Sequence, residues 1–111
     1  MKLSEIVRKL ELKTVSQTDL GSKEITGVYV SDMVSDIIAN AQAGNLLVTV
    51  QIHNNVIAAA NLVDISGIVV TQGKQPAPEV VKMADKAAIP ILSTDLNGWQ
   101  VMTKLYEAGV R

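Results

Sequence analysis

Short apolar runs alternate along the chain with helix-like stretches, and each of these runs ends in a cluster of polar residues. A short apolar run is typical of a buried strand, whereas apolar residues at helical spacing indicate a helix. Strands that alternate with helices predict βαβ crossovers and therefore a parallel sheet. The polar clusters that follow the apolar runs are Ser31-Asp32, Gln51 to Asn55, Thr71-Gln72-Gly73 and Ser93-Thr94-Asp95.

The segment before the repeats predicts one helix and two strands. Ser4 is a favourable N-cap residue, and apolar residues at helical spacing follow it. The next two apolar segments are typical of strands, and turn-forming residues separate them. The predicted helix covers residues 4–10, and the predicted strands cover residues 12–16 and 25–30.

A helix is predicted directly after the second of these strands. Ser31 suits its N-cap, and Asp32 suits the positive end of its dipole. Gly44 suits a left-handed conformation at its C-terminal end. A strand over residues 46–50 follows. The apolar residues that form the stripe of this helix are Met33, Val34, Ile37, Ile38 and Ala41.

The next helix, which Asn54 or Asn55 can cap and which runs to Val63, is apolar nearly all the way round. Such a helix is buried on more than one side. Two interpretations stay open. The helix is either the central helix of a monomer, or its second face meets another subunit that its alanines allow to approach closely.

The last two units follow the same plan. Pro78 suits the first position of a helix that follows a strand over residues 68–70, and Pro90 marks the entry to a strand over residues 91–92. A final helix is predicted over residues 97–108, with Gly109 as its stop. The residues expected to face inward are Val80, Val81, Ala84, Ala87, Ala88, Val101, Met102 and Leu105.

These elements predict one α/β domain over residues 1–111, with three layers and a mainly parallel β-sheet flanked by helices. The composition agrees, because the chain has 3% aromatic residues and no Phe, which suits small-residue packing of helices on a parallel sheet. The chain has no cysteine, which excludes disulfides and thiolate metal sites. The formal charge of −1 and the dispersed lysines argue against a nucleic-acid partner. We expect a cytoplasmic protein, because no apolar run suggests a signal peptide or a membrane span.

Catalytic motifs are absent from the sequence. Gly73-Lys74 lacks the glycine spacing and the hydroxyl of a P-loop, and there is no dinucleotide fingerprint. The single histidine, His53, leaves only a formal triad with Ser93 and Asp95, without a nucleophile elbow. Asp32, Asp64 and Asp95 have the chemistry to bind Mg²⁺, but their spacing is unspecific. We therefore expect no catalytic residues, no metal site and no cofactor.

The polar clusters are the candidate ligand site. The carboxyl ends of parallel strands meet at one edge of a sheet, where ligands of α/β proteins usually bind. Free backbone N–H groups at helix N-termini favour an anion there. The candidate ligand-binding residues are Ser31, Asp32, His53, Asn54, Asn55, Thr71, Gln72, Gly73, Ser93, Thr94 and Asp95.

Most of the chain also resembles a known family. The DRTGG domain is similar in its strands, in the polar turn and alanine-rich helix between them, and in the proline-flanked segments near the end. Ile25-Thr26-Gly27 and the helix from Asp32 extend the resemblance toward the N-terminus. The segments that carry it are Gly44-Asn45-Leu46-Leu47-Val48-Thr49, Ile65-Ser66-Gly67-Ile68-Val69-Val70-Thr71-Gln72-Gly73, Pro78-Glu79-Val80 and Ile89-Pro90-Ile91-Leu92.

The resemblance implies a regulatory or ligand-sensing module that is distantly similar to the N-terminal domain of HPr kinase/phosphorylase. Two signature positions depart from the family pattern. The family's Thr-Gly-Gly falls on Thr71-Gln72-Gly73, and its Asp-Arg falls on Ile52-His53, where His53 could replace part of the arginine's donor function. Kinase activity belongs to a P-loop half that this sequence does not contain, so we expect none.

Three hypotheses about function follow. The favoured one is a non-catalytic module, forming a homodimer, that binds a small anionic or nucleotide-like metabolite at the strand ends. The second is a protein–protein interaction module that uses the apolar helix over residues 56–63. The third is a small enzyme that uses Asp95, His53 and Asp32.

Overall fold

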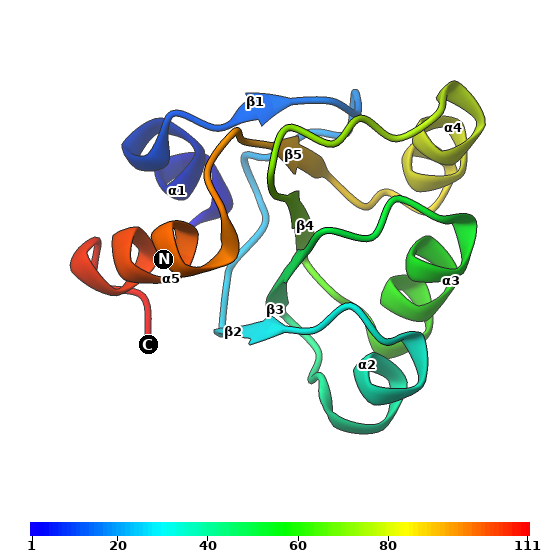
Figure 1. Cartoon of the computed structure of the whole chain (residues 1–111), viewed down its shortest axis with the longest axis horizontal. Coiled ribbons are helices and arrows are strands. Elements are labelled where there is room, and N and C mark those ends of the chain that lie inside the picture. Colours follow the sequence, from blue (N-terminus) through cyan, green and yellow to red (C-terminus); the bar gives the residue numbers. More distant parts are fainter.

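The computed structural model describes residues 1–111 and contains a five-stranded sheet in the order β1-β5-β4-β3-β2 (Figure 1). Strands β2 to β5 are parallel to their neighbours, and β1 is antiparallel to β5. The strands are β1 (Lys13–Thr14), β2 (Gly27–Val30), β3 (Asn45–Thr49), β4 (Gly67–Val70) and β5 (Ile91–Ser93). The helices are α1 (Leu3–Leu10), α2 (Val34–Asn40), α3 (Asn54–Val63), α4 (Pro78–Lys86) and α5 (Gly98–Glu107).

Helices cover both faces of this sheet, which confirms the predicted three-layer α/β fold. Helices α2, α3 and α4 lie on one face, and α1 and α5 lie on the other (Figure 1). The three crossovers from β2 to β5 step in the same direction, and right-handed crossovers of this kind place their helices on one face.

Each face of the sheet has its own core, since successive residues of a strand point to opposite faces. Leu47 of β3 belongs to a cluster of 13 buried residues beneath α2, α3 and α4. Its neighbour Leu46 belongs to a cluster of 12 buried residues beneath α1 and α5. The central strands are therefore apolar on both faces, as the continuous apolar runs predicted.

The first strand is shorter than predicted. Regular pairing covers only Lys13 and Thr14, opposite Ser93 and Leu92 of β5. Ser16 is buried, and its hydroxyl oxygen accepts a hydrogen bond of 2.7 Å from the backbone N–H of Ile91. A side chain thus takes the donor that a regular strand would pair with a backbone carbonyl, and the ladder ends there.

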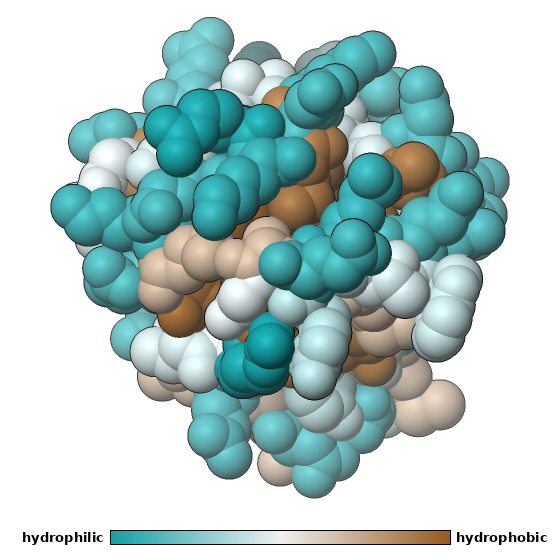
Figure 2. Space-filling model, turned by 90° about the vertical axis from the view of Figure 1, so that its left-hand side faces the viewer, coloured by the Kyte–Doolittle hydropathy of each residue, from teal (hydrophilic) through white to brown (hydrophobic).

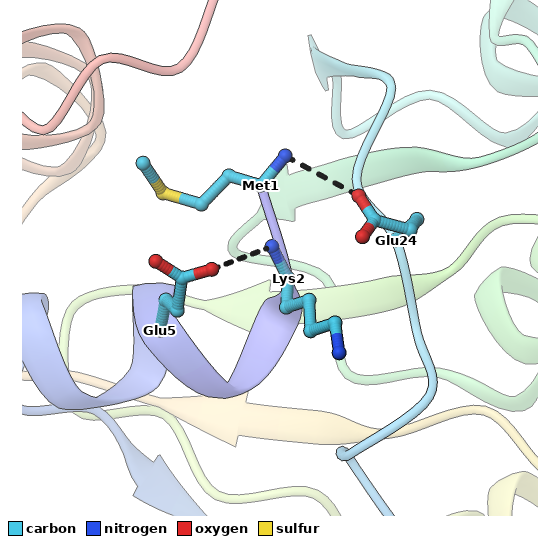
Figure 3. A network of polar contacts seen from close by, with 4 residues as sticks. All are labelled: Met1, Lys2, Glu5 and Glu24. Atoms are coloured by element: carbon cyan, nitrogen blue, oxygen red, sulfur yellow. Dashed lines mark hydrogen bonds and ion pairs between the residues drawn. The ribbon is translucent and has the colours of Figure 1, made fainter.

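The N-terminal residues are tied to the segment that precedes β2. The backbone N–H of Leu3 donates to the carbonyl of Lys23, and the amino group of Met1 lies 3.4 Å from Oε2 of Glu24 (Figure 3). The backbone N–H of Lys2 also points at the Glu5 carboxylate, 3.4 Å away. Lys2 is the N-cap residue of α1, so the prediction that Ser4 caps this helix is wrong.

Two predicted helix ends also differ. The residue after α2 is Ala41, and Gly44 instead lies in the turn before β3, although its φ of 85° is left-handed as predicted. A Cβ at Gly44 would lie 2.6 Å from Oγ1 of Thr26, so this close approach also requires glycine. Ala88 was expected to face inward but is exposed, because it leaves α4 with a φ of 58°.

Three residues of the predicted apolar helix faces are exposed, namely Met33 and Ile38 of the stripe and Met102, which was expected to face inward. Met33 is the N-cap of α2, Ile38 lies on α2, and Met102 lies on α5. These two helices are the outermost elements beside the edge strand β2 (Figure 1). One side of each apolar stripe therefore has no neighbour within the chain.

Helix α3 lies between α2 and α4 and contacts both. Its buried residues are Val56, Ile57, Ala59 and Ala60, which makes it the central helix of its layer. Its outer face remains exposed, with Leu62 at 70%. No helix of the chain is long and apolar enough to span a membrane.

Candidate functional site

All four polar clusters lie at the same edge of the sheet, as the parallel topology predicted. The register places Val30 of β2 beside Val48 of β3. It also places Thr49 beside Val70 of β4, and Val70 beside Ser93 of β5. The residues that follow these strands are therefore neighbours, although they do not share one cavity.

Asp32 joins the end of β2 to the end of β3. Its Oδ1 accepts hydrogen bonds from the Thr49 hydroxyl at 2.8 Å and from the backbone N–H of Val50 at 2.9 Å. Helix α2 begins later, at Val34, so Asp32 does not serve the helix dipole as predicted. Its carboxylate therefore connects the ends of β2 and β3 through hydrogen bonds.

Ser31 is not the N-cap of α2, contrary to the prediction. The N-cap is Met33, and its backbone N–H donates to the Ser31 hydroxyl at 3.2 Å. Ser31 therefore forms a local turn one step before the helix.

His53 is the N-cap of α3, a position that was predicted for Asn54 or Asn55. Its Nδ1 accepts a hydrogen bond of 3.2 Å from the backbone N–H of Asn55. The space beside His53, Gln51 and Ile52 measures about 10 Å³, which is no more than one water molecule needs. In this structure the cluster after β3 therefore caps a helix and lines no ligand-sized cavity.

The cluster after β4 forms a tight turn. Gln72 and Gly73 both have left-handed φ angles, of 62° and 67°, and the backbone N–H of Lys74 donates to the Thr71 carbonyl. This is the pattern of a type I′ turn, in which two successive glycines are favoured. The Gly-Gly of the family signature thus has a conformational reason, and Gln72 adopts a conformation that costs a non-glycine residue about 1–2 kcal/mol.

The backbone donors of this turn are already used. The N–H of Gln72 donates to the Leu96 carbonyl at 2.8 Å, and that of Gly73 donates to the Thr94 carbonyl at 2.9 Å. A Cβ on Gly73 would lie only 3.0 Å from Oδ1 of Asp95. The turn therefore fastens the end of β4 to the loop after β5, and these two N–H groups are not available to an anion.

The cluster after β5 lines a polar cavity of about 300 Å³. Ser93 and Thr94 contribute to it, and Asp95 and Leu96 complete this part of its wall. The Thr94 hydroxyl also accepts a hydrogen bond of 3.2 Å from the backbone N–H of Leu96, which shapes the loop. Of the four predicted clusters, this is the one that borders a cavity large enough for a small ligand.

Three lysines from three different elements line the same cavity. Lys9 comes from the end of α1, Lys13 from β1 and Lys104 from α5. None of their ammonium groups forms an ion pair, since the one ion pair of the chain joins Met1 to Glu24. Figure 2 shows that the side of the molecule covered by α1 and α5 is largely hydrophilic, with hydrophobic residues visible in hollows.

The sequence did not point to this cluster, because Lys9 and Lys13 lie near the start of the chain, Lys104 lies near its end, and the three belong to no motif. Two carboxylates, Glu11 and Asp95, share the cavity with them. The cavity therefore combines an excess of positive charge with two acceptors for hydroxyl groups.

A second polar group lies between β2 and α2. The Tyr29 hydroxyl is 2.9 Å from both carboxylate oxygens of Asp36, and the Asn40 amide donates to the same carboxylate at 2.8 Å. Hydrogen bonds from Ser31, Asn40 and Tyr29 lower the pKa of Asp36. The hydrogen bond to Asp36 raises the pKa of Tyr29, and partial desolvation and the negative charge of Asp36 raise it further.

The structure contains no group of three or more His, Asp or Glu side chains that could hold a metal ion. Asp64 lies at the C-cap of α3, at the opposite end of the strands from Asp32 and Asp95. His53 and Ser93 line different spaces, and the Nδ1 of His53 is occupied by Asn55. The magnesium set and the triad considered from the sequence are therefore not assembled.

Comparisons with known proteins agree with this architecture. Residues 5–108 match the sequence model of the DRTGG domain. The crystal structure of the CBS and DRTGG domains of the regulatory region of Clostridium perfringens pyrophosphatase, complexed with the activator diadenosine tetraphosphate, has a TM-score of 0.71 to this chain. The identity is 17%, and the match covers 94% of this chain but 45% of that one. No curated protein matches the chain.

Proposed function

This chain belongs to the DRTGG domain family, and from that membership we propose that it is a non-catalytic regulatory module that senses a small anionic, nucleotide-like ligand. The observation that carries the proposal is the 300 Å³ cavity at the carboxyl end of β5, with its three unpaired lysines. The regulatory region of the clostridial pyrophosphatase, whose fold is similar, was solved with a dinucleotide activator. That complex supports a nucleotide-like ligand for this chain.

The charges of the cavity favour an anion. Lys9, Lys13 and Lys104 place three positive charges around one space, against two negative ones from Glu11 and Asp95. Like charges near one another repel, and a bound anion would relieve this repulsion while it gains several charge-assisted hydrogen bonds. The lysines can surround a phosphate group without matching a fixed geometry, because their ammonium donors are rotatable.

The volume of the cavity and its two carboxylates further restrict the kind of ligand that can bind. A volume of about 300 Å³ lies at the lower end of the range for small-molecule sites. The carboxylates of Glu11 and Asp95 can accept hydrogen bonds from sugar hydroxyls, while the lysines bind phosphate. No aromatic side chain lines the cavity, so we propose that the sugar-phosphate part of a nucleotide is recognised there and that the base lies outside.

The proposed module has no catalytic activity. The sequence has no P-loop, and the candidate catalytic residues are not assembled into one site. We expect that the purified chain will not transfer phosphate from ATP to an HPr-like protein, and the expected distant similarity to HPr kinase/phosphorylase stays a prediction. We also propose that the module acts in the cytoplasm and forms a homodimer.

Thermal unfolding with a panel of nucleotides, pyrophosphate and neutral nucleosides tests the ligand proposal. A ligand at about 100 times its Kd stabilises a folded chain by about 2.7 kcal/mol, which corresponds to a rise in Tm of roughly 10 °C for a domain of this size. We expect this rise with a phosphorylated nucleoside and not with the nucleoside alone.

The double variant Lys13→Gln/Lys104→Gln identifies the site. It should fold and lose the ligand-induced rise, whereas Lys86→Gln, which removes an exposed lysine on α4, should keep it. If no phosphorylated compound raises the Tm, or if the double variant responds as the unmodified chain does, the proposed site is wrong.

A further inference from the structure

The exposed large hydrophobic side chains are concentrated at one edge of the molecule. Six of the eight such residues lie on β2, on α5, on α2 or at the N-cap of α2. In Figure 1, β2 is the lowest strand of the sheet, with α5 on its left and α2 on its right. The six residues are Val30, Met33, Ile38, Trp99, Met102 and Tyr106.

Strand β2 is an open edge without the usual protection. It pairs only with β3, so one side of its backbone has no partner strand. Its sequence, Gly27-Val28-Tyr29-Val30, contains no charged residue and no proline. Natural proteins usually protect an edge with such residues or with a very short strand. The opposite edge follows this rule, because β1 has two residues and one of them is Lys13.

Two apolar grooves lie along α5, and one of them reaches this edge. One measures about 400 Å³ and lies between Val28 and Val30 of β2 and Leu105 of α5. The other measures about 420 Å³ and includes Trp99. Both grooves are lined by Met102 and Tyr106, so they form one continuous surface along α5.

We propose that a second copy of this chain docks on this surface, with the two β2 edges antiparallel about a two-fold axis and with α5 and α2 packing against their copies. This inference rests on the homodimer part of the proposed function and identifies its interface. It differs from the interpretation, left open by the sequence, in which the second face of the apolar helix over residues 56–63 meets another subunit.

Self-complementarity is the reason that the occupant is a second copy. A two-fold axis brings the same strand edge of both subunits together, so each unpaired backbone group meets a partner of matching chemistry. The charges near the grooves also match across such an axis, because Glu107 and Arg111 carry opposite signs and line the two grooves. The Arg111 guanidinium lies 3.8 Å from the centre of the Tyr106 ring. This contact holds the positive charge of Arg111 next to the proposed interface.

The available area suits a stable dimer. Trp99 and Tyr106 are 71% and 64% exposed, and because an aromatic side chain can bury about 150–250 Å², the two together offer roughly 300 Å². The four other side chains and the strand edge extend this area toward the ~800 Å² that each partner of a standard interface buries. Trp, Tyr and Met are also among the residues that are enriched in interface cores.

The groove between α3 and α4 is the competing surface. It measures about 500 Å³ and exposes Leu62 and Met83, but it has no aromatic residue and no free strand edge, and Lys86 lies in it. Leu62 therefore provides a matched control, since it is as exposed as Trp99.

Sedimentation equilibrium of the full chain over about 1–500 µM tests the proposal, because interfaces of this size span Kd values from micromolar downward. We expect a dimer. Val30→Lys and Tyr106→Glu should each weaken it at least tenfold without loss of the circular-dichroism spectrum, and Leu62→Lys should leave it unchanged. A monomer throughout this range, or a dimer that Leu62→Lys weakens and Val30→Lys does not, would overturn the inference.

Cross-linking gives a second measurement that does not depend on the stability of a charged variant. The chain has no cysteine, so Val30→Cys and Leu62→Cys each introduce a single thiol. A short bismaleimide should join two Val30→Cys chains and should not join two Leu62→Cys chains; the reverse pattern contradicts the proposed face. Ligand-induced Tm shifts measured on the Tyr106→Glu variant separate the two proposals, because Tyr106 does not line the lysine cavity.

Discussion

The hydroxyl of Thr49 donates a hydrogen bond of 2.8 Å to the carboxylate of Asp32, and this contact joins the ends of two neighbouring parallel strands. Asp32 belongs to the candidate site predicted from the sequence, yet its side chain faces that of Thr49 within the chain. The backbone N–H of Val50 donates to the same carboxylate oxygen at 2.9 Å. We infer that Asp32 contributes to the stability of the carboxyl edge.

Asp32→Ala should lower the free energy of unfolding by about 1–2 kcal/mol, since it removes two hydrogen bonds to a charged acceptor. Urea denaturation measures this change. Thr49→Val removes the hydroxyl partner and keeps the side-chain volume, so the double variant should lose less than the sum of the two single changes. Strict additivity would show that the two side chains do not interact in solution.

Gln72→Gly should stabilise the chain. Gln72 has a left-handed φ of 62°, which glycine adopts without steric cost. The gain is about 0.5–1 kcal/mol after the greater flexibility of glycine in the unfolded chain is subtracted. Gln72→Ala is the control, because it shortens the same exposed side chain and keeps the strained conformation. Equal stability of the two variants in denaturant would contradict the explanation of the turn.

His53→Ala should lower the free energy of unfolding by about 0.5–1 kcal/mol, because the first turn of α3 loses the acceptor for the Asn55 N–H. His53→Asn should restore this stability, since Asn is a favourable N-cap residue. Both variants should show the same ligand-induced Tm rise as the unmodified chain. A rise that disappears in His53→Asn would make His53 a ligand contact in place of a cap.

The Tyr29–Asp36 hydrogen bond predicts that the stability of the folded chain decreases at both acidic and alkaline pH. In the folded chain, the pKa of Asp36 lies below its ordinary value of 3.8. The Asp36 carboxylate therefore stabilises the fold fully above its pKa in the unfolded chain, and this stabilisation is lost as the pH falls through its pKa in the folded chain. In the folded chain, the pKa of Tyr29 lies above its ordinary value of 10.0. The protonated Tyr29 hydroxyl therefore stabilises the fold fully below pH 10.0, and this stabilisation is lost as the pH rises through the pKa of Tyr29 in the folded chain.

Tyr29→Phe removes the hydroxyl and should reduce the loss of stability at both pH extremes. Thermal unfolding followed by circular dichroism from acidic to alkaline pH measures it. Tyr106→Phe, which has no carboxylate partner, is the control and should leave the loss of stability at acidic pH unchanged. If Tyr29→Phe loses stability at acidic pH as the unmodified chain does, the Tyr29 hydrogen bond does not stabilise the ionised form of Asp36.

Much of the fold could be predicted from local patterns. The five helices and the strands from β2 to β5 lie close to their predicted positions, because their apolar residues recur with the period of each element. The end of β1 could not be predicted, since it depends on the Ser16 hydroxyl and a residue 75 positions away. The caps of α1, α2 and α3 were misassigned for a related reason. The N-caps are Lys2, Met33 and His53, because the path of the chain, and not the capping preference of a side chain, decides where each helix begins.

The sequence by itself determined that this protein is a three-layer α/β domain and that four polar clusters lie at one edge of its sheet. Periodicity and the handedness of βαβ crossovers are sufficient for both. Only the tertiary structure decided which cluster borders a cavity, because Lys104 of α5 meets Lys9 and Lys13 of the N-terminal segment there. It also decided that Asp32, His53 and the turn at Gln72 satisfy partners within the chain. Hydrogen-bond partners and charge clusters depend on distances in space, which the order of residues does not contain.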